Sequence, residues 1–161
     1  MYVIYIQYSL KNLVIKKTLY NHCKTHLEKK MEVLEQQKER LQKDLTSETK
    51  STAGDKHETG RAMIQLEREK LGSQIHEIEL NYKRLNTIKD VKTSTSISLG
   101  SIVFTDKANY YVAIAADCCQ INGKAFYCIS TQSPIGKLLI GKKMNESIMF
   151  NGIESTILEI K

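Results

Sequence analysis

Asp55 and Glu58 are the residues of this chain whose types and spacing best suit chemistry. Carboxylate oxygens are hard ligands, and Mg²⁺ commonly takes one or two of them and fills its other positions with water or phosphate. Two carboxylates do not complete a site, so the pair would act only where a partner supplies the remaining ligands. The same Asp-x-x-Glu pattern is typical of a helix start, where Asp55 caps a backbone N–H and Glu58 bonds back. Both interpretations stay open from the residues alone.

Other polar residues suggest chemistry less clearly. His57, between the two acids, is either a base or phosphate contact or an exposed histidine without a role. His22 and His26 have the i, i+4 spacing of helical metal ligands, but no third ligand is evident. The four cysteines show no C-x-x-C spacing, which fits a reducing cytosol, and we expect Cys118, Cys119 and Cys128, in or beside predicted strands, to be buried thiols. No nucleophile motif or glycine-rich phosphate loop is present, and we do not expect an enzyme.

The two acids lie where two heptad-patterned stretches mirror each other. The residue numbers of the facing apolar pairs add to a constant total, which places the midpoint between Gly54 and Asp55. A constant total is what an antiparallel helical hairpin requires. Lys38 interrupts the first arm and is predicted to lie opposite Leu71. The predicted seam consists of Leu27, Met31, Leu34, Leu41 and Leu45 on one arm and Ile64, Leu71, Ile75, Ile78, Tyr82 and Leu85 on the other.

The chain therefore divides into a coiled-coil hairpin over residues 15–92, with its tip at 46–59, a linker at 93–98 and a β-rich domain at 99–161. In that domain Asn122-Gly123 and Asn151-Gly152 are type I′ hairpin signals. Ser133 as N-cap, Pro134 at the first helical position and Gly141 as the stop predict one short helix. The expected strands are Ile102–Thr105, Tyr110–Ala115, Lys124–Ser130, Ser147–Phe150 and Glu154–Ile160.

Residues 1–14 are apolar but lie outside the clean heptads, and they lack the basic start and cleavage site of a signal peptide. We interpret them as a non-native or poorly packed extension, with a short strand or a partner-binding segment as the alternative. No stretch is long and apolar enough to span a bilayer, and we expect a cytoplasmic protein without a membrane partner.

Charge adds a weaker signal. The net charge is +6, with both signs interspersed along the hairpin, which is typical of a solvated helix surface. A mild attraction to nucleic acid, and with it DNA binding, or to an acidic protein channel is the functional alternative. Lys137, Lys142 and Lys143 cluster around the short helix and form either a basic docking patch or a solubilising surface.

Two segments together resemble the Gre-type transcript cleavage factors (GreA/GreB). Gly54-Asp55-Lys56-His57-Glu58 is similar to their tip motif Gly-Asp-x-x-Glu-Asn. The stretch from Ser133 to Lys142, Ser-Pro-Ile-Gly-Lys-Leu-Leu-Ile-Gly-Lys, is similar to a segment of their C-terminal domain. The resemblance covers roughly residues 15–161 and includes the order of the parts. It implies an α+β fold in which an antiparallel coiled-coil hairpin precedes a small FKBP-like antiparallel β domain with one short helix.

The resemblance also implies a function. Gre factors bind bacterial RNA polymerase at the rim of its secondary channel, and their hairpin brings the tip acids to the polymerase active site. There the acids help to hold a second Mg²⁺ and to orient a water, so that the polymerase cleaves its own backtracked transcript. By this resemblance Asp55 and Glu58 are the catalytic and metal-binding residues, acting in trans on Mg²⁺ shared with the polymerase and in indirect contact with nascent RNA. The expected partner-binding residues are Ser133, Pro134, Ile135, Ile140, Gly141 and Lys142.

Two departures from the family pattern define alternatives. The family's Asn after the second acid is Thr59 here, and its bulky apolar residue after the first is Lys56. The first alternative is a secondary-channel regulator or inhibitor that binds polymerase without stimulating cleavage. The second, from another class, is a structural coiled-coil adaptor whose tip acids are only caps. Because the hairpin satisfies its own seam, we expect a monomer.

Overall fold

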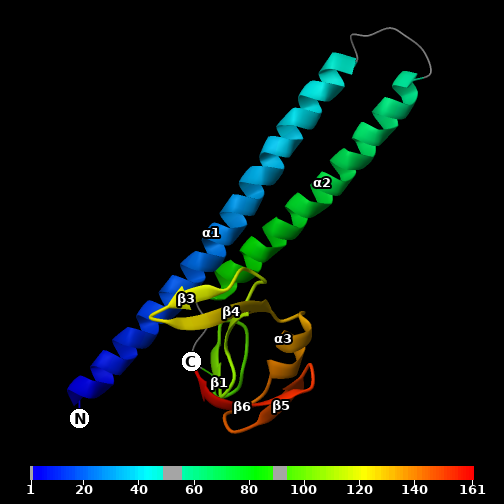
Figure 1. Ribbon diagram of the computed structural model, residues 1–161. Helices are drawn as coiled ribbons and strands as arrows, with labels where there is room; N and C mark the ends of the chain where they lie inside the picture. Colours follow the sequence, from blue (N-terminus) through cyan, green and yellow to red (C-terminus); the bar gives the residue numbers. More distant parts are fainter. Residues whose placement is uncertain (1, 49–55, 89–93) are drawn as a thin grey trace. The chain divides into compact units, whose positions relative to one another are not determined.

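The computed structural model describes the backbone of residues 2–48, 56–88 and 94–161, and the side chains of 12–46, 59–88 and 94–161. Helix α1 spans Tyr2–Glu48 and helix α2 spans Lys56–Thr87. The strands are β1 (Ile102–Thr105), β2 (Asn109–Ala113), β3 (Cys119–Ile121), β4 (Lys124–Ser130), β5 (Ser147–Phe150) and β6 (Ile153–Ile160), with α3 (Pro134–Leu139) between β4 and β5. The predicted class, a helical hairpin followed by a small sheet with one short helix, is confirmed (Figure 1).

The chain forms two compact units, which do not coincide with a simple division along the sequence. The hairpin unit comprises residues 27–82, and the sheet unit combines residues 1–26 with residues 83–161. Helix α1 begins at Tyr2, so the backbone of residues 2–14 is helical, and the alternative of a short strand at the start of the chain is wrong. No helix in the described parts of the chain has the length and hydropathy to cross a membrane.

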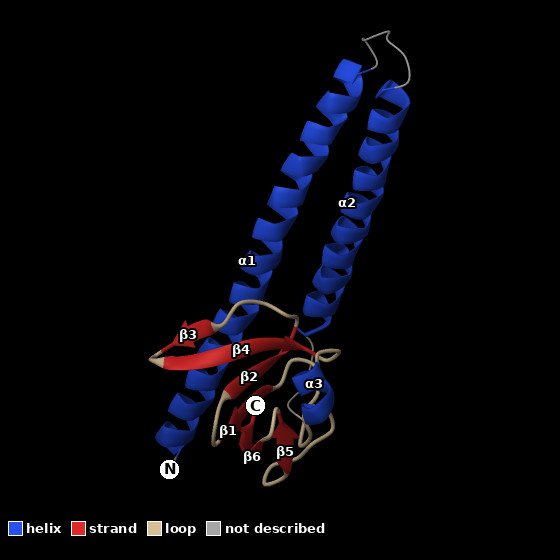
Figure 2. Cartoon of the chain, turned by 45° about the vertical axis from the view of Figure 1, so that its right-hand side comes forward, coloured by secondary structure: helices blue, strands red, loops and turns tan. Residues whose placement is uncertain are grey.

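Six strands form one sheet in the order β3-β4-β2-β1-β6-β5 (Figure 2). All neighbours are antiparallel except β2 and β4, which run parallel with Asn109 opposite Phe126 and Ala113 opposite Ser130. The Asn122-Gly123 turn has φ angles of 51° and 75°, as type I′ requires, but it joins β4 to β3. The expectation of a purely antiparallel sheet, with this turn following the strand over 110–115, is therefore corrected. The three-residue edge strand β3 was missed.

The sheet is covered on both faces. One face buries Val103, Val112 and Ile129 against Ile135 and Leu139 of α3 and against β5 and β6. Because side chains alternate along a strand, Tyr111, Phe126 and Cys128 lie on the opposite face. In the same unit Ile15, Leu19 and Cys23 of α1, Leu85 of α2 and Ile88 just after it are also buried. Ile15 lines a cavity together with Phe126. The segment of α1 from Ile15 to Cys23 is therefore part of the buried interior of the sheet unit.

Candidate functional site

Of the two predicted tip acids, Glu58 belongs to α2, and Asp55 directly precedes this helix in the sequence. This helix begins at Lys56, directly after Asp55 in the sequence, as the expected helix start near 55–59 predicts. Glu58 falls in its first turn. Asp55 itself and the side chains of His57 and Glu58 lie outside the described residues, so their proposed roles as ligands or caps stay predictions.

The hairpin that precedes and follows this tip is built on the predicted seam. Leu27, Leu41, Leu71 and Ile78 are buried. Most positions between the predicted seam residues are exposed. The remaining seam residues of the hairpin unit are half-buried: Met31, Leu34, Leu45, Ile64, Ile75 and Tyr82. A heptad pattern thus accounts for which face of each arm is covered.

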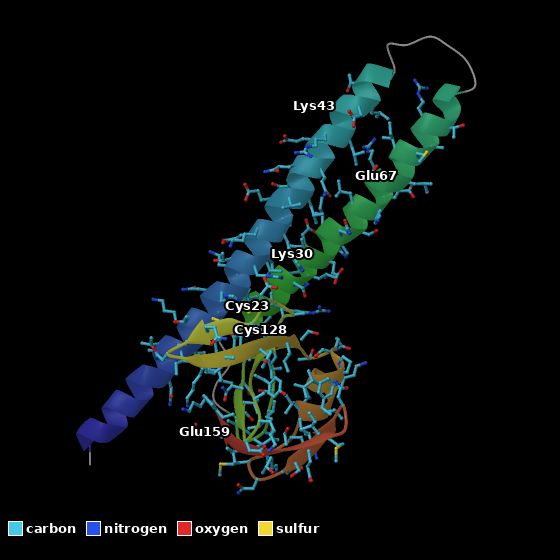
Figure 3. The ribbon with its side chains drawn as sticks, in the orientation of Figure 1. Cys23, Lys30, Lys43, Glu67, Cys128 and Glu159 are labelled. Carbon is cyan, nitrogen blue, oxygen red and sulfur yellow. The ribbon has the colours of Figure 1, made fainter. Side chains whose placement is uncertain are left out.

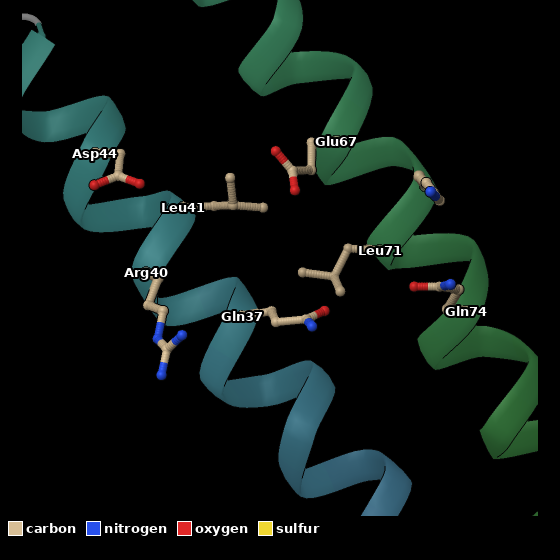
Figure 4. A pocket seen from close by; sticks show the side chains of 8 residues that line it. Gln37, Arg40, Leu41, Asp44, Glu67, Leu71 and Gln74 are labelled. Carbon is tan, nitrogen blue, oxygen red and sulfur yellow. The ribbon is translucent and has the colours of Figure 1, made fainter.

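Packing between the arms is open near the tip. A cavity of about 480 Å³ lies between α1 and α2, and Leu41 and Leu71 point toward one another across it (Figure 4). Lys38, which we expected opposite Leu71, is exposed and does not line this cavity, and Leu41 faces Leu71 instead. The polar residues around the two leucines are Gln37, Arg40, Asp44, Glu67, Lys70 and Gln74.

The second predicted site, residues 133–142, is organised by α3. The Ser133 hydroxyl accepts a hydrogen bond from the Gly136 N–H (3.1 Å) and donates one to the Ser130 carbonyl (2.7 Å). Pro134 occupies the first turn, as predicted, and Gly141 adopts φ +81° after the helix ends. The Gly141 N–H donates to the carbonyl of Ile97 (2.8 Å), which ties the end of this segment to residues that we predicted as linker.

Burial separates two kinds of residue in this segment. Ile135 is buried in the core, and the Ser133 hydroxyl caps the start of α3. Both residues therefore stabilise the segment rather than offer a contact surface. Ile140 is 40% exposed and presents an apolar side chain to solvent. The sequence analysis missed two exposed apolar neighbours, Leu138 and Met144. They follow Ile135 at multiples of three residues, a spacing that could have drawn attention to them, but of the three only Ile135 is buried in the core. We call Leu138, Ile140, Lys142 and Met144 the α3 surface.

Lys142 is held by an acid on the same segment. Its ammonium donates to Glu146 (3.0 Å), and the Lys143 N–H donates to the other carboxylate oxygen (2.6 Å). These bonds, that from Lys142 first, lower the pKa of Glu146 below its ordinary value of 4.5. The pair is half-exposed, so it orients the lysine more than it stabilises the fold.

His22 and His26 bind a residue of the sheet domain rather than a metal. The Nε2–H of His22 donates to the backbone carbonyl of Asp117 (2.8 Å), and His26 Nδ1 contacts the Asp117 carboxylate (3.2 Å). Within the described residues no group of three or more His, Cys, Asp or Glu side chains is arranged to hold a metal ion. The helical spacing that resembled a ligand pair instead fixes α1 on the loop before β3.

Comparisons with known proteins give the following. No protein-family model matches the chain, and no curated protein matches it. Among solved structures, it is similar to GreA factor homolog 1 (Gfh1) of Thermus thermophilus, with 21% identity over 88% of this chain and 94% of that one and a TM-score of 0.33. It is also similar to Gfh1 of Thermus aquaticus, with 23% identity over 85% and 94% and a TM-score of 0.32.

Proposed function

We propose that this chain is an elongation factor that binds bacterial RNA polymerase, inserts its hairpin into the secondary channel and stimulates cleavage of backtracked transcripts. The main support for the proposal is that α2 begins directly after Asp55, so that the Asp-x-x-Glu motif runs from the segment between the two long helices into the first turn of α2. The second resembling segment forms a capped helix with exposed apolar residues, as a docking element requires.

The shape of the hairpin suits a channel. Helix α2 has 32 residues, which corresponds to a length of about 48 Å. Two packed helices are only about 20 Å across, so such an element reaches a buried active site that a globular domain does not enter. Its arms are mostly polar outside the seam and therefore tolerate a hydrated channel wall.

The chemistry of the tip rests on its donor set. Asp55 and Glu58 offer hard carboxylate oxygens, which suit Mg²⁺ but fill only part of its six positions. In the proposal the polymerase and its substrate provide the other ligands, and the shared Mg²⁺ stabilises the charge that develops during phosphodiester hydrolysis. In this proposal the tip residues bind the shared Mg²⁺ and orient a water, and the chain alone has no nuclease activity.

Docking is assigned to the α3 surface. Leu138, Ile140 and Met144 supply the exposed apolar area, and the paired Lys142 supplies an oriented charge at its side. Protein interfaces usually have apolar residues at their centre and charged residues at their rim. A partner surface that is apolar with an acidic margin would fit it.

A cleavage assay tests the proposal. Backtracked elongation complexes of the host's own polymerase are incubated with Mg²⁺, with and without the full chain, and the transcripts are sized. We expect shortened transcripts that resume elongation. Slowed elongation without shortening would instead favour the channel-blocking regulator, for which Lys56 and Thr59 are the motivation. No effect combined with stable self-association would favour the adaptor.

The tip acids are tested by removing their charge and keeping their capping ability. In Asp55→Asn/Glu58→Gln both residues remain good capping residues. We expect the variant to melt within a few degrees of the parent, roughly 3 °C, because the caps persist, yet to lose cleavage stimulation. Asp44→Asn/Glu67→Gln removes the same charge from the hairpin arms and is the matched control, which should keep its activity. Equal activity of all three proteins would exclude the tip acids from the mechanism.

The docking surface has its own test. Ile140→Asp places a charge on the α3 surface, while Ile153→Asp places one on an exposed apolar residue of β6. We expect polymerase binding to weaken at least tenfold for the first, by roughly 1.4 kcal/mol or more, and to change little for the second. Equal affinities, measured by titration of labelled chain, would move the docking site elsewhere.

A further inference from the structure

A second cavity lies within the sheet unit, between the first part of α1 and one face of the sheet. Its volume is about 500 Å³, which is in the range of small-molecule sites in proteins. Asn12 and Ile15 of α1 line one side of it, and residues of the strands line the rest. The cavity shares no residue with the tip or the α3 surface, so it is a candidate for a separate role.

The floor of the cavity is a row of residues that face one another across four neighbouring strands. Phe126 of β4 is opposite Asn109 of β2, and Asn109 is opposite Phe104 of β1. Phe104 is in turn opposite Glu159 of β6, which is labelled in Figure 3. Opposite residues on adjacent strands have their side chains on the same face of a sheet. Two aromatic rings, an amide and a carboxylate therefore border one space.

The side chains of this floor are held by one another. The ring centroids of Phe104 and Phe126 are 5.8 Å apart, and the two rings are nearly perpendicular, at 85°. The Lys161 ammonium lies 4.8 Å from the centroid of the Phe104 ring and 3.1 Å from the Glu159 carboxylate. The Asn109 amide donates a hydrogen bond to a backbone carbonyl of β4 (3.0 Å). A ligand would therefore meet a preorganised surface, which lowers the entropic cost of binding.

An irregularity in β6 adds an apolar wall. The register of β6 against β1 shifts after Phe104, so Leu158 has no opposite residue on β1. Bulges of this kind re-aim side chains and are common next to functional sites. Leu158 and Glu159, although consecutive, both line the cavity, and Leu158 is 52% exposed. The cavity thus has an apolar margin that is open to solvent.

One cation at the cavity is available to a ligand. Lys161 is paired with Glu159, whereas no salt bridge involves Lys124 within the described residues. Lys124 begins β4, is opposite Ile121 of β3 and lines the cavity beside it. Its side chain is exposed, so the ammonium stands at the mouth. An anionic group that enters here gains a charge-assisted hydrogen bond.

We propose that this cavity is a binding site for a small planar aromatic carboxylate of about two fused rings. The rings of the ligand pack against Phe104 and Phe126, because aromatic groups favour edge-to-face and offset contacts. The carboxylate pairs with Lys124. A cavity of about 150 Å³ holds one benzene ring, so the larger volume here accommodates a bicyclic ligand together with water. The site is independent of the polymerase function proposed above.

The first experiment measures binding by the full chain. Protein labelled with ¹⁵N is titrated with 2-naphthoate, and the amide shifts are recorded by NMR. We expect saturable shifts at the residues that line the cavity, with a Kd of roughly 0.1–1 mM for a ligand of this size. The absence of saturable shifts at millimolar naphthoate, or shifts confined to other residues, would overturn the proposal.

Two further compounds test the ligand class. The amide 2-naphthamide has the same shape without the charge, and octanoate has the charge without the rings. We expect naphthamide to bind about fivefold more weakly than naphthoate, and octanoate to bind more weakly than either. Octanoate that binds as tightly as naphthoate would contradict the aromatic assignment, and naphthamide that does so would contradict the role of the charge.

A pair of lysine variants tests the charge on the protein. Lys124→Gln should bind naphthoate about fivefold more weakly and naphthamide as the parent does. Lys83→Gln removes the same charge from an exposed position near the end of α2 and is the matched control, which should bind naphthoate like the parent. Equal naphthoate affinities of the two variants would exclude Lys124 from the site.

A second pair tests the position of the ligand. Leu158→Trp places a large side chain at the cavity, whereas Ile153→Trp places one on an exposed residue of the same strand that does not line it. We expect the first variant to lose binding of both naphthalene compounds and the second to keep it. Both positions are exposed, so both variants should melt close to the parent. Naphthoate binding that persists in Leu158→Trp would place the ligand elsewhere. The lysine pair keeps the proposal testable if Leu158→Trp folds poorly.

Discussion

The hairpin unit and the sheet unit bury their apolar residues in different ways. Each hairpin arm covers one narrow stripe, and the cavity between Leu41 and Leu71 shows that the stripe is thinly filled near the tip. In the sheet unit both faces are covered, and Leu139, Ile157 and Tyr111 are completely buried. Substitutions should therefore cost more stability in the sheet unit, which depends on close packing, than in the hairpin, which depends on its heptad pattern.

The largest contrast should come from removing one leucine from each unit. Leu139→Ala empties a fully buried position beside the sheet and should cost about 4 kcal/mol of unfolding free energy. Leu71→Ala, at the edge of an existing cavity, should cost only about 2 kcal/mol. Hydrogen exchange measured by mass spectrometry separates the two units. Equal losses of unfolding free energy in the two variants would mean that the hairpin is packed as tightly as the sheet unit.

Replacing a glycine with alanine should change the free energy of unfolding in opposite directions in the two units. A Cβ on Gly136 would lie 2.0 Å from the backbone carbonyl oxygen of Ser130, so Gly136→Ala should destabilise the sheet unit by about 3 kcal/mol. A Cβ on Gly72 meets nothing within 4 Å, so Gly72→Ala should stabilise α2 by about 0.5–1 kcal/mol. Thermal unfolding of both variants gives the comparison. A stable Gly136→Ala protein would show that α3 shifts easily.

The smallest effect concerns acid. The Thr156 N–H and Lys107 lower the pKa of Asp106 below its ordinary value of 3.8. The resulting stabilisation is present above that value and is lost as the pH falls through the lowered folded-state pKa. We expect Asp106→Asn to flatten the stability profile of the sheet unit below pH 4 and to leave hairpin exchange unchanged. An identical acid profile for parent and variant would assign the acid sensitivity to other carboxyl groups.

Local signals predicted most of the elements. The cap at Ser133, the two Asn-Gly turns and the heptad positions all describe contacts within a few residues or along one repeat, so they can be read without the fold. The same holds for the start of α2 beside Asp55, which a single capping pattern anticipates. The start of α2 was therefore predictable from the sequence.

Non-local contacts account for what was missed. The parallel pairing of β2 with β4 joins strands that are not consecutive, and β3 is too short to show alternation. Helix α1 begins at Tyr2, although the β-branched and aromatic residues at the start of the chain favour a strand. Ile15, Leu19 and Cys23, further along the same helix, are buried in the sheet unit, and this packing favours the helix. The partners of His22 and His26 were invisible because Asp117 lies on a distant loop.

The sheet unit is discontinuous, and this has a consequence during synthesis. Its first piece, residues 1–26, leaves the ribosome before any of residues 83–161 exist. At about 5–20 residues per second, the apolar face of α1 waits several seconds or more for the strands that cover it. Nascent chains released before β4 is complete would therefore carry an uncovered apolar helix face, and they would be natural clients of a ribosome-associated chaperone.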